Sequence, residues 1–478
     1  MTATNLTQNL TQNLTKNFAP ARPSLSRRGF LGGLASGAAA LALAACSGGS
    51  RKSGPSGAVE YWLWDASQLP AYEACAAAFE EATGIHVNIT QIAWDDYWTK
   101  LTAGFIAGTG PDAFTDHISK FAQFVDLDVL LPLDEQAAWS GVDESAFQEG
   151  LIDLWKGEDG RQYGCPKDWD TEAVFYNKDM LADAGLSEKD LAAWTWNPDD
   201  GGTFERILAR LTVDKNGVRG DEDGFDKSRI AVYGLSIKDA GSADGQTQWS
   251  PFTGSVGDWY YTNKETWGDR YRYDDPVFQK TMDWYFGLVD KGYMPPRGAF
   301  STTSGTDVQL GSGSIAMCIN GSWMFNTYAN LEINVGIAAN PVGPNGTSVS
   351  LFNGLGDSIA KQSGNIENAS KWVAFLGTAE AQDIVASYGV VFPAIASSTR
   401  KAVEVFERTG LPTAPFTDHV DRGTTFYFPL TYFGADVAAI MKPATDALWA
   451  ERRPASTLTR ANEQINLLFE TSTTHDKG

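Results

Sequence analysis

Residues 59–90 read VEYWLWDASQLPAYEACAAAFEEATGIHVNIT, and the order of elements in this stretch decides the fold. The β-rich start predicts a strand that ends at Trp64 or Asp65. Apolar residues at helical spacing predict a helix over 69–83, and Gly84 is placed to cap its C-terminus. Alternating apolar residues after this glycine predict a second strand. Strand, helix and strand of these lengths form a right-handed unit, so we expect a parallel sheet.

The following residues extend this sheet and point to a binding edge. A second helix is predicted over 96–107, and residues 112–116 read as the end of another strand. Ligands of open α/β sheets lie beyond the carboxyl ends of the strands. The residues at the two strand ends are therefore candidates for a site: Trp64, Asp65, Asp116 and His117.

Length and composition limit the classes of protein. The chain has 478 residues, of which 43% are hydrophobic, which is enough for two or more domains with sizeable cores. A formal net charge of -22 argues against binding that depends on Lys and Arg neutralising nucleic-acid phosphates. It also argues against a basic helix on a membrane surface. The 16 Trp suit a surface where an apolar face meets a polar ligand.

The N-terminal residues predict export. Residues 1–45 contain the pair Arg27-Arg28 and then a Gly/Ala-rich apolar run that ends in Leu-Ala-Ala before Cys46. The pair resembles a twin-arginine export signal, and the end of the run resembles a lipobox. These resemblances imply cleavage before Cys46 and a lipid on its sulfur. The Gly/Ser-rich composition of the residues that follow predicts a flexible tether over 46–57. An ordinary cleaved signal or a buried Ala-rich helix is the alternative.

Three cysteines remain in the body of the chain. Cys75, Cys165 and Cys318 show no C-x-x-C motif and no spacing typical of a zinc site. We interpret them as small buried apolar residues. One disulfide plus a free thiol is the alternative in an oxidising compartment.

Several sequence motifs resemble one known family. Residues 163–166 read YGCP and residues 173–186 read AVFYNKDMLADAGL. Further pieces follow the family's order at 79–85, 110–112, 131–133, 313–323 and 369–376. Together they are similar to the bacterial extracellular solute-binding proteins (family 1), the maltose-binding-protein-like receptors that feed sugar ABC importers.

The resemblance implies a fold class and a division of the chain. The fold is α/β of the periplasmic-binding-protein type II, in which two α/β lobes are joined by a multi-strand hinge and the ligand lies between them. Carried over by position, residues 58–168 plus 354–405 form the N-terminal lobe. Residues 169–353 plus 406–478 form the C-terminal lobe.

Residue patterns in the second predicted lobe agree with this class. Apolar spacing over 277–291 predicts a helix that ends before Gly292. Alternation over 315–319 predicts a strand, after which residues 321–323, Gly-Ser-Trp, open a helix whose free N–H groups could face a ligand.

Sugar recognition explains the mixture of candidate site residues. A pyranose offers flat C–H patches to aromatic faces and hydroxyls to carboxylates. The aromatic candidates are Trp64, Trp169, Trp249, Trp259, Trp323 and Tyr427; the acceptors are Asp65, Asp116 and Asp168; further polar contacts are Lys167, His117 and Asn353. The family's binding positions map onto Trp64, Asp65, Asp116, Trp323 and the return strand at Asn353-Gly354.

An acidic stretch before residue 230 raises the question of calcium. Its oxygen donors are Asp214, Asn216, Asp221, Asp223 and Asp226. The spacing departs from an EF-hand loop because no Glu stands at the final position. A solvated acidic turn and a calcium site are both open at this point, and no other cofactor is indicated.

Three classes of function remain. The leading hypothesis is a monomeric carbohydrate receptor, anchored by a lipid at Cys46 to the outer face of the cytoplasmic membrane, which delivers sugar to an ABC permease without chemistry of its own. A second is a binding protein of the same fold for a polyamine, which the negative charge suits, or for a metal ion or peptide. The third is a secreted glycosidase, which needs two carboxylates flanking the scissile bond; no such paired motif stands out.

Overall fold

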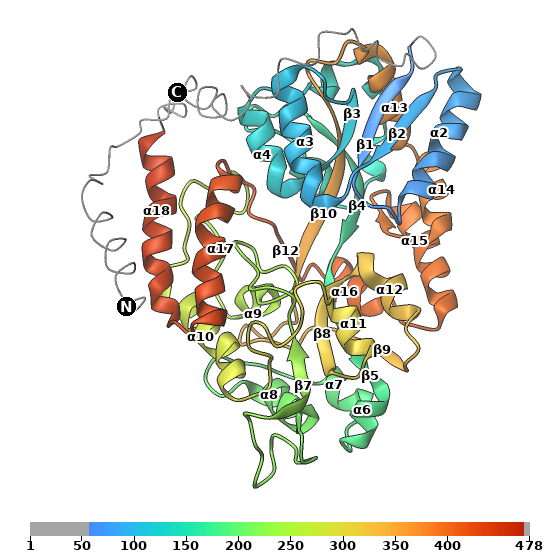
Figure 1. Ribbon diagram of the computed structural model, residues 1–478. Helices are drawn as coiled ribbons and strands as arrows, with labels where there is room; N and C mark the ends of the chain where they lie inside the picture. Colours follow the sequence, from blue (N-terminus) through green and yellow to red (C-terminus); the bar gives the residue numbers. More distant parts are fainter. Residues whose placement is uncertain (1–56, 473–478) are drawn as a thin grey trace, which may run out of the picture. The chain divides into compact units, whose positions relative to one another are not determined.

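The computed structural model describes residues 57–472, which contain two β-sheets and the helices around them (Figure 1). The first sheet has the strand order β11-β4-β10-β3-β1-β2, and β12 pairs with β10. Its strands are β1 Val59–Leu63, β2 Val87–Gln91, β3 Ala113–His117, β4 Gly164–Asp170, β10 Ser350–Ile359, β11 Phe392–Pro393 and β12 Thr425–Tyr427. The second sheet has the order β6-β7-β8-β5-β9. Its strands are β5 Glu172–Asn177, β6 Val213–Asp214, β7 Ile230–Ser236, β8 Ile315–Gly321 and β9 Val335–Ala338.

Seventeen α-helices are described. They are α2 Leu69–Thr83, α3 Trp94–Ala107, α4 Ile118–Asp126, α5 Leu151–Leu154, α6 Lys178–Asp183, α7 Glu188–Ala192, α8 Gly202–Leu211, α9 Ser250–Ser255, α10 Pro276–Asp290, α11 Thr306–Gly311, α12 Phe325–Ala329, α13 Ile366–Leu376, α14 Ala379–Tyr388, α15 Ala396–Phe406, α16 Ala414–Asp421, α17 Gly434–Ala450 and α18 Leu458–Thr471. In the first sheet, α13 packs on β1, β4 and β10, while α4 packs on β3 and β10. None of the helices within 57–472 is long and apolar enough to cross a membrane.

The strand-helix-strand unit at the start of the described chain is confirmed. β1 pairs in parallel with β2 in a register that places Val59 opposite Val87. α2 has the predicted bounds, and Gly84 ends it in the left-handed conformation with φ 72°, which a residue without a side chain adopts at low cost. Tyr72 and Phe79 are buried on the face of α2 that packs against the sheet.

The carboxyl ends of β1 and β3 lie at one edge because the two strands are parallel neighbours. Trp64 follows β1, and His117 ends β3 and caps the N-terminus of α4. The predicted helix over 277–291 is α10, shifted by one residue at each end. The strand over 315–319 is confirmed as β8, and the turn after it forms a single turn of 3-10 helix at Ser322–Met324 before the short α12.

The chain passes between the sheets from β4 to β5, and again through residues 339–349 from β9 to β10. β4 ends at Asp170 in the first sheet and β5 begins at Glu172 in the second, so only Thr171 separates them. β10 runs beside β4, with Asn353 opposite Asp170. The two connecting segments are therefore neighbours, and their side chains can bond to each other.

The three described cysteines are buried and free, which confirms their interpretation as small core residues. Cys75 lies on α2, Cys165 on β4 and Cys318 on β8. The predicted signal segment, Cys46 and most of the tether lie outside the described residues.

Candidate functional site

A cavity of about 250 Å³ lies beyond the carboxyl ends of β7 and β8, and we call it the Trp323 cavity. Its lining includes Lys238, Asp239, Thr247, Asp307, Asn320 and Trp323. The Trp323 ring lies so close to Gly321 that a Cβ built on this glycine would sit 1.7 Å from it. The glycine therefore provides the space that the ring occupies. Of the sequence-predicted site residues, Trp323 is the one that lines this cavity.

The polar groups around the Trp323 cavity are of the kinds that hydroxyls bind. Oδ1 of Asp239 accepts hydrogen bonds from the backbone N–H of Gly241 at 2.9 Å and from Nε2 of Gln248 at 3.0 Å. Nδ2 of Asn320 donates to the Tyr328 hydroxyl at 3.1 Å. These bonds hold a carboxylate and an amide in place beside an aromatic face. Carboxylates, amides and one indole ring are a set that suits a sugar.

An aromatic cluster lies at the ends of β1 and β3, and we call it the Trp64 cluster. The Trp64 ring centroid is 5.1 Å from that of Trp94, 5.2 Å from Tyr97 and 5.3 Å from Trp98. Trp94 is 43% exposed, and Trp64 is half-buried. The cluster thus offers an exposed aromatic surface at the edge where the sequence predicts a site. Asp65 follows at once and accepts a hydrogen bond from the backbone N–H of Ser67 at 2.8 Å.

His117 belongs to the same edge and is held neutral. Its Nδ1 accepts a hydrogen bond from the backbone N–H of Ser119 at 3.1 Å. Burial, helped by the charge of Lys120, lowers the pKa of His117 to about 3. The preceding Asp116 is also buried, and its Oδ1 accepts a hydrogen bond from the backbone N–H of His117 at 2.8 Å. Burial raises the pKa of Asp116, so the structure shields this carboxyl instead of presenting it.

A chain of polar contacts leads from His117, beside the Trp64 cluster, to Gln246, the neighbour in sequence of a residue that lines the Trp323 cavity. Nδ2 of Asn353 lies 3.2 Å from Nε2 of His117 and donates to Oδ2 of Asp170 at 2.9 Å. Oδ1 of Asp170 accepts from Nε2 of Gln246 at 2.9 Å. The next residue, Thr247, lines the cavity. The predicted contact Asn353 therefore lies between the two candidate surfaces.

Asp170 and Glu172, which we call the crossing carboxyls, flank the single residue between the sheets. Oε2 of Glu172 accepts a hydrogen bond from the Ser350 hydroxyl at 2.7 Å, and the same hydroxyl oxygen accepts from the Glu172 backbone N–H at 2.7 Å. Both carboxyls are buried. Burial raises the pKa of Glu172 to about 8. Burial, and then the negative charges of Glu172 and Asp168, raise the pKa of Asp170.

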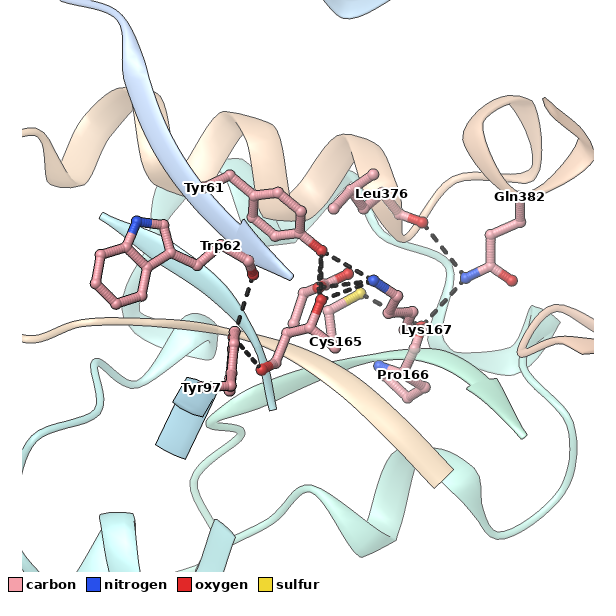
Figure 2. A network of polar contacts seen from close by, with 10 residues as sticks. Tyr61, Trp62, Tyr97, Cys165, Pro166, Lys167, Leu376 and Gln382 are labelled. Carbon is pink, nitrogen blue, oxygen red and sulfur yellow. Dashed lines mark hydrogen bonds and ion pairs between the residues drawn. The ribbon is translucent and has the colours of Figure 1, made fainter. Parts of the chain in front are cut away.

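Lys167 is the centre of a different group, the Lys167 network, within the first sheet (Figure 2). Its Nζ donates to the Thr115 hydroxyl at 2.7 Å and to the Tyr61 hydroxyl at 3.0 Å. Nζ also lies 3.8 Å from Oδ1 of Asp357 and 3.6 Å from the centroid of the Tyr72 ring. The Lys167 side chain is 1% exposed, so its ammonium group bonds to partners inside the sheet and does not reach a ligand as predicted.

Several other predicted contacts also have core positions. The Trp169 ring stacks on Phe392 at 4.7 Å, and Nε1 of Trp249 donates to the carbonyl of Ala240 at 3.1 Å. Trp259 stacks on Phe278 at 4.5 Å. These rings are buried, and none lines the Trp323 cavity.

The remaining predicted contacts vary in exposure. Asp168 is buried, and burial raises its pKa to about 7 against the opposing charge of Lys167. Gly354 is a buried residue of β10 opposite Trp169. Tyr427 is half-buried on β12.

The acidic stretch does not form a metal site in this structure. Oδ1 of Asp214 accepts hydrogen bonds from the backbone N–H groups of Asn216 at 2.8 Å and Val218 at 2.9 Å. Oδ1 of Asp221 lies 3.4 Å from Nη1 of Arg210. Within residues 57–472, no group of three or more His, Cys, Asp or Glu side chains is placed to hold a metal ion. The carboxylates of the proposed calcium set, Asp214, Asp221, Asp223 and Asp226, are thus not gathered around a common point.

Sequence reasoning missed residues on both candidate surfaces. Trp94 and Trp98 are one helical turn apart at the start of α3, directly after β2, and this spacing could have indicated them. Lys238, Asp239 and Asp307 lie in loops or at a helix start without any periodic pattern.

Comparison with known proteins agrees with this architecture. The sequence model of the family described as bacterial extracellular solute-binding protein matches residues 74–412. The galactooligosaccharide-binding protein of Bacillus subtilis is 25% identical over 357 residues, covering 71% of this chain and 74% of that protein. The maltodextrin-binding protein MdxE of the same organism is 24% identical over 446 residues, covering 91% and 96%.

A solved structure shows the same fold. The crystal structure of M. tuberculosis UspC superposes with a TM-score of 0.67 at 25% identity, covering 86% of this chain and 99% of that one. This likeness confirms the predicted α/β class, the periplasmic-binding-protein type II.

Proposed function

The chain belongs to the bacterial extracellular solute-binding proteins, and on this premise we propose that it captures a carbohydrate outside the cytoplasm and delivers it to an ABC permease. It performs no chemistry of its own in this proposal. Two relatives are named for galactooligosaccharide and maltodextrin binding, which supports a saccharide as the solute.

The Trp323 cavity is the observation that carries the proposal. It combines one indole face with the carboxylates of Asp239 and Asp307 and the amide of Asn320. A pyranose uses both kinds of group, because its C–H face stacks on an indole and its hydroxyls bond to carboxylates and amides. The Trp64 cluster supplies a second aromatic surface, and polar contacts through Asn353, Asp170 and Gln246 run between the two surfaces.

The proposal includes movement of two lobes about the segments that connect the sheets. We assign residues 58–168 plus 354–405 to one lobe and 169–353 plus 406–478 to the other. The separation of β4 and β5 by one residue supports a boundary near 170. Closure about such a hinge brings binding surfaces of the two lobes onto one ligand.

Export and anchoring complete the proposal. A lipid on Cys46 and the tether over 46–57 would hold the receptor, as a monomer, at the outer face of the cytoplasmic membrane beside its permease. Palmitate labelling of the full chain tests this. Loss of the label in Cys46→Ala is the expected result, and a labelled variant contradicts it.

The test of solute class is a thermal shift panel on the mature protein. At least one mono- or oligosaccharide should raise the melting temperature and change Trp fluorescence, because a ligand that binds only the folded state stabilises it. A shift with spermidine and none with any sugar would favour a polyamine receptor. Product released from a chromogenic glycoside would favour an enzyme.

Replacing the stacking ring locates the site. Trp323→Ala should weaken binding of the best sugar by about 1–3 kcal/mol, because it removes an aromatic face. Trp323→Phe keeps a ring and should retain most of the affinity, so it is the matched control. Isothermal titration calorimetry measures both. Unchanged affinity in a folded Trp323→Ala variant would place the sugar elsewhere.

A further inference from the structure

A second cavity adjoins the Trp323 cavity, and we call it the cationic cavity. Its volume is about 240 Å³, and it shares Lys238 and Asp239 with the lining of its neighbour. It continues over residues 295–304 to α17. A ligand that extends past Lys238 from one cavity therefore enters the other.

Three cations face two acids in the lining of the cationic cavity, and both acids are already engaged. The cations are Lys238, Arg297 and Lys442. Asp446 is shared, because its Oδ2 lies 3.1 Å from Nζ of Lys442 and 3.8 Å from Nη2 of Arg297. Asp239 accepts the two hydrogen bonds described above. The lining therefore retains positive charge.

Lys238 is the cation without a partner. Among the described residues, nothing forms a hydrogen bond or ion pair with its side chain. Its charge stands at the junction of the two cavities, in a chain whose formal net charge is -22. Such a group is free to pair with a ligand, and a charge-assisted bond to an anion is stronger than one to a neutral hydroxyl.

The cationic cavity also has surfaces that suit a sugar unit. Phe300 and Trp449 line it together with the hydroxyl residues Ser301 and Ser304. Arg297 and Lys442 have side chains that are 53% and 64% exposed, so their charged ends are accessible. Guanidinium and ammonium groups beside hydroxyl donors are typical of carboxylate recognition.

We propose that the cationic cavity binds the carboxylate of a uronic acid unit in an oligosaccharide whose neutral unit lies on Trp323. This inference rests on the proposed function and specifies its substrate class. The acidic unit pairs with Lys238 and Arg297, and the neighbouring ring stacks in the Trp323 cavity.

The experiment uses matched pairs of disaccharides that differ in oxidation at C6. Cellobiose is compared with cellobiouronic acid, and galactobiose with its derivative in which one of the two units is oxidised to galacturonic acid, by titration calorimetry on the mature protein; each acidic sugar thus keeps one neutral unit. In at least one pair the acidic sugar should bind about tenfold or more tightly, which is the effect of one charge-assisted bond. Its advantage should shrink as sodium chloride rises, because salt screens exposed charges.

Variants separate the charge from the fold. Arg297 lines the cationic cavity and not the Trp323 cavity. Arg297→Gln should therefore lower the affinity for the acidic sugar and leave the affinity for the neutral sugar unchanged. Lys238→Gln should lower the ratio of acidic to neutral affinity, and Lys238→Arg should restore it. Lys371→Gln, on α13, lies outside the lining of both cavities; it is the control and should change neither affinity.

The outcomes distinguish the two proposals. Neutral sugars that bind as well as their acidic partners in every pair would overturn this inference and leave the carbohydrate receptor intact. An acidic preference that persists in both Arg297→Gln and Lys238→Gln would also overturn it. Absence of binding to every saccharide would overturn the proposed function, and this inference with it.

Discussion

The Lys167 network and the crossing carboxyls are both buried and titratable, but their charges differ. Lys167 and Glu172 are only five positions apart in the chain. The first group contains a cation, a carboxylate and hydroxyls that belong to one sheet. The second contains two carboxyls whose described hydrogen-bond donors are amides and hydroxyls, and it lies where the chain passes between sheets.

Because of this difference in charge, the Lys167 network should keep one protonation state, whereas the crossing carboxyls should gain or lose protons with pH. Removing one member of a buried ion pair leaves the other charge without compensation, which is strongly destabilising. Two buried carboxyls without a nearby cation instead retain a proton, because burial and mutual repulsion disfavour the charged form. The interior of the first sheet is therefore set by charge pairing, whereas the connection between the sheets can change its protonation near neutral pH.

The largest effect should come from the Lys167 network. Lys167→Met should lower the free energy of unfolding by about 3–5 kcal/mol, because it leaves Asp357 buried and unpaired. Urea denaturation measures the loss. The double variant Lys167→Met/Asp357→Asn should be more stable than Lys167→Met alone, since it also removes the orphaned charge. A single variant within about 1 kcal/mol of the wild type would show that the network does not hold the sheet.

The crossing carboxyls should show a smaller effect that depends on pH. The folded state keeps the Glu172 proton up to a pKa of about 8, against an ordinary value of 4.5. The unfolded chain releases this proton at lower pH than the folded state does. The contribution of protonated Glu172 to the free energy of unfolding is therefore complete below the ordinary pKa, and it is lost as pH rises through about 8.

Glu172→Gln removes the part of the pH dependence of stability that comes from the Glu172 carboxyl. Relative to the wild type, its melting temperature should be nearly equal at pH 5 and higher by a few degrees at pH 8.5. The carboxyls of Asp168, Asp170 and Asp244 surround the position, so the remaining slope belongs to them. Glu367→Gln, which alters an exposed carboxyl on α13, is the control. Wild-type and Glu172→Gln curves that stay parallel from pH 5 to 8.5 would contradict this assignment.

The smallest effect on stability should come from an exposed ion pair, Lys371 with Glu367, which serves as the reference for both buried groups. Nζ of Lys371 lies 2.7 Å from Oε1 of Glu367, closer than Lys167 lies to Asp357, but both side chains are exposed. Lys371→Met should change the free energy of unfolding by about 0.5 kcal/mol or less. The same urea titration tests it. A loss comparable to that of Lys167→Met would mean that proximity, and not burial, sets the energy of these pairs.

The fold could be predicted from the sequence because its first elements have clear periodicities. α2 has the predicted bounds, and β1 and β2 pair in parallel as the strand-helix-strand order predicts. Trp323 was also predicted to lie at a binding surface, and it lines a cavity.

The exposure of other site residues could not be predicted. Every residue of β4 is buried, so alternation along this strand does not separate core side chains such as Lys167 and Trp169 from side chains that would face a ligand. Trp249 and Trp323 are the same residue type, and only their tertiary neighbours distinguish a core ring from a cavity wall. Lys238 and Asp307 both line the Trp323 cavity although they are about 70 positions apart in the sequence. No local sequence pattern predicts that two such distant residues lie in one cavity.

The three free, buried thiols can report local opening of the structure, because each reacts with a thiol reagent only when it becomes exposed. Cys75 and Cys165 lie with the first sheet and Cys318 lies in the second. Burial raises the pKa of Cys75 and Cys318 to about 12, so the reactive thiolate is scarce while the structure is closed. A thiol reagent followed by mass spectrometry would therefore time the transient exposure of each sheet separately, without any introduced label.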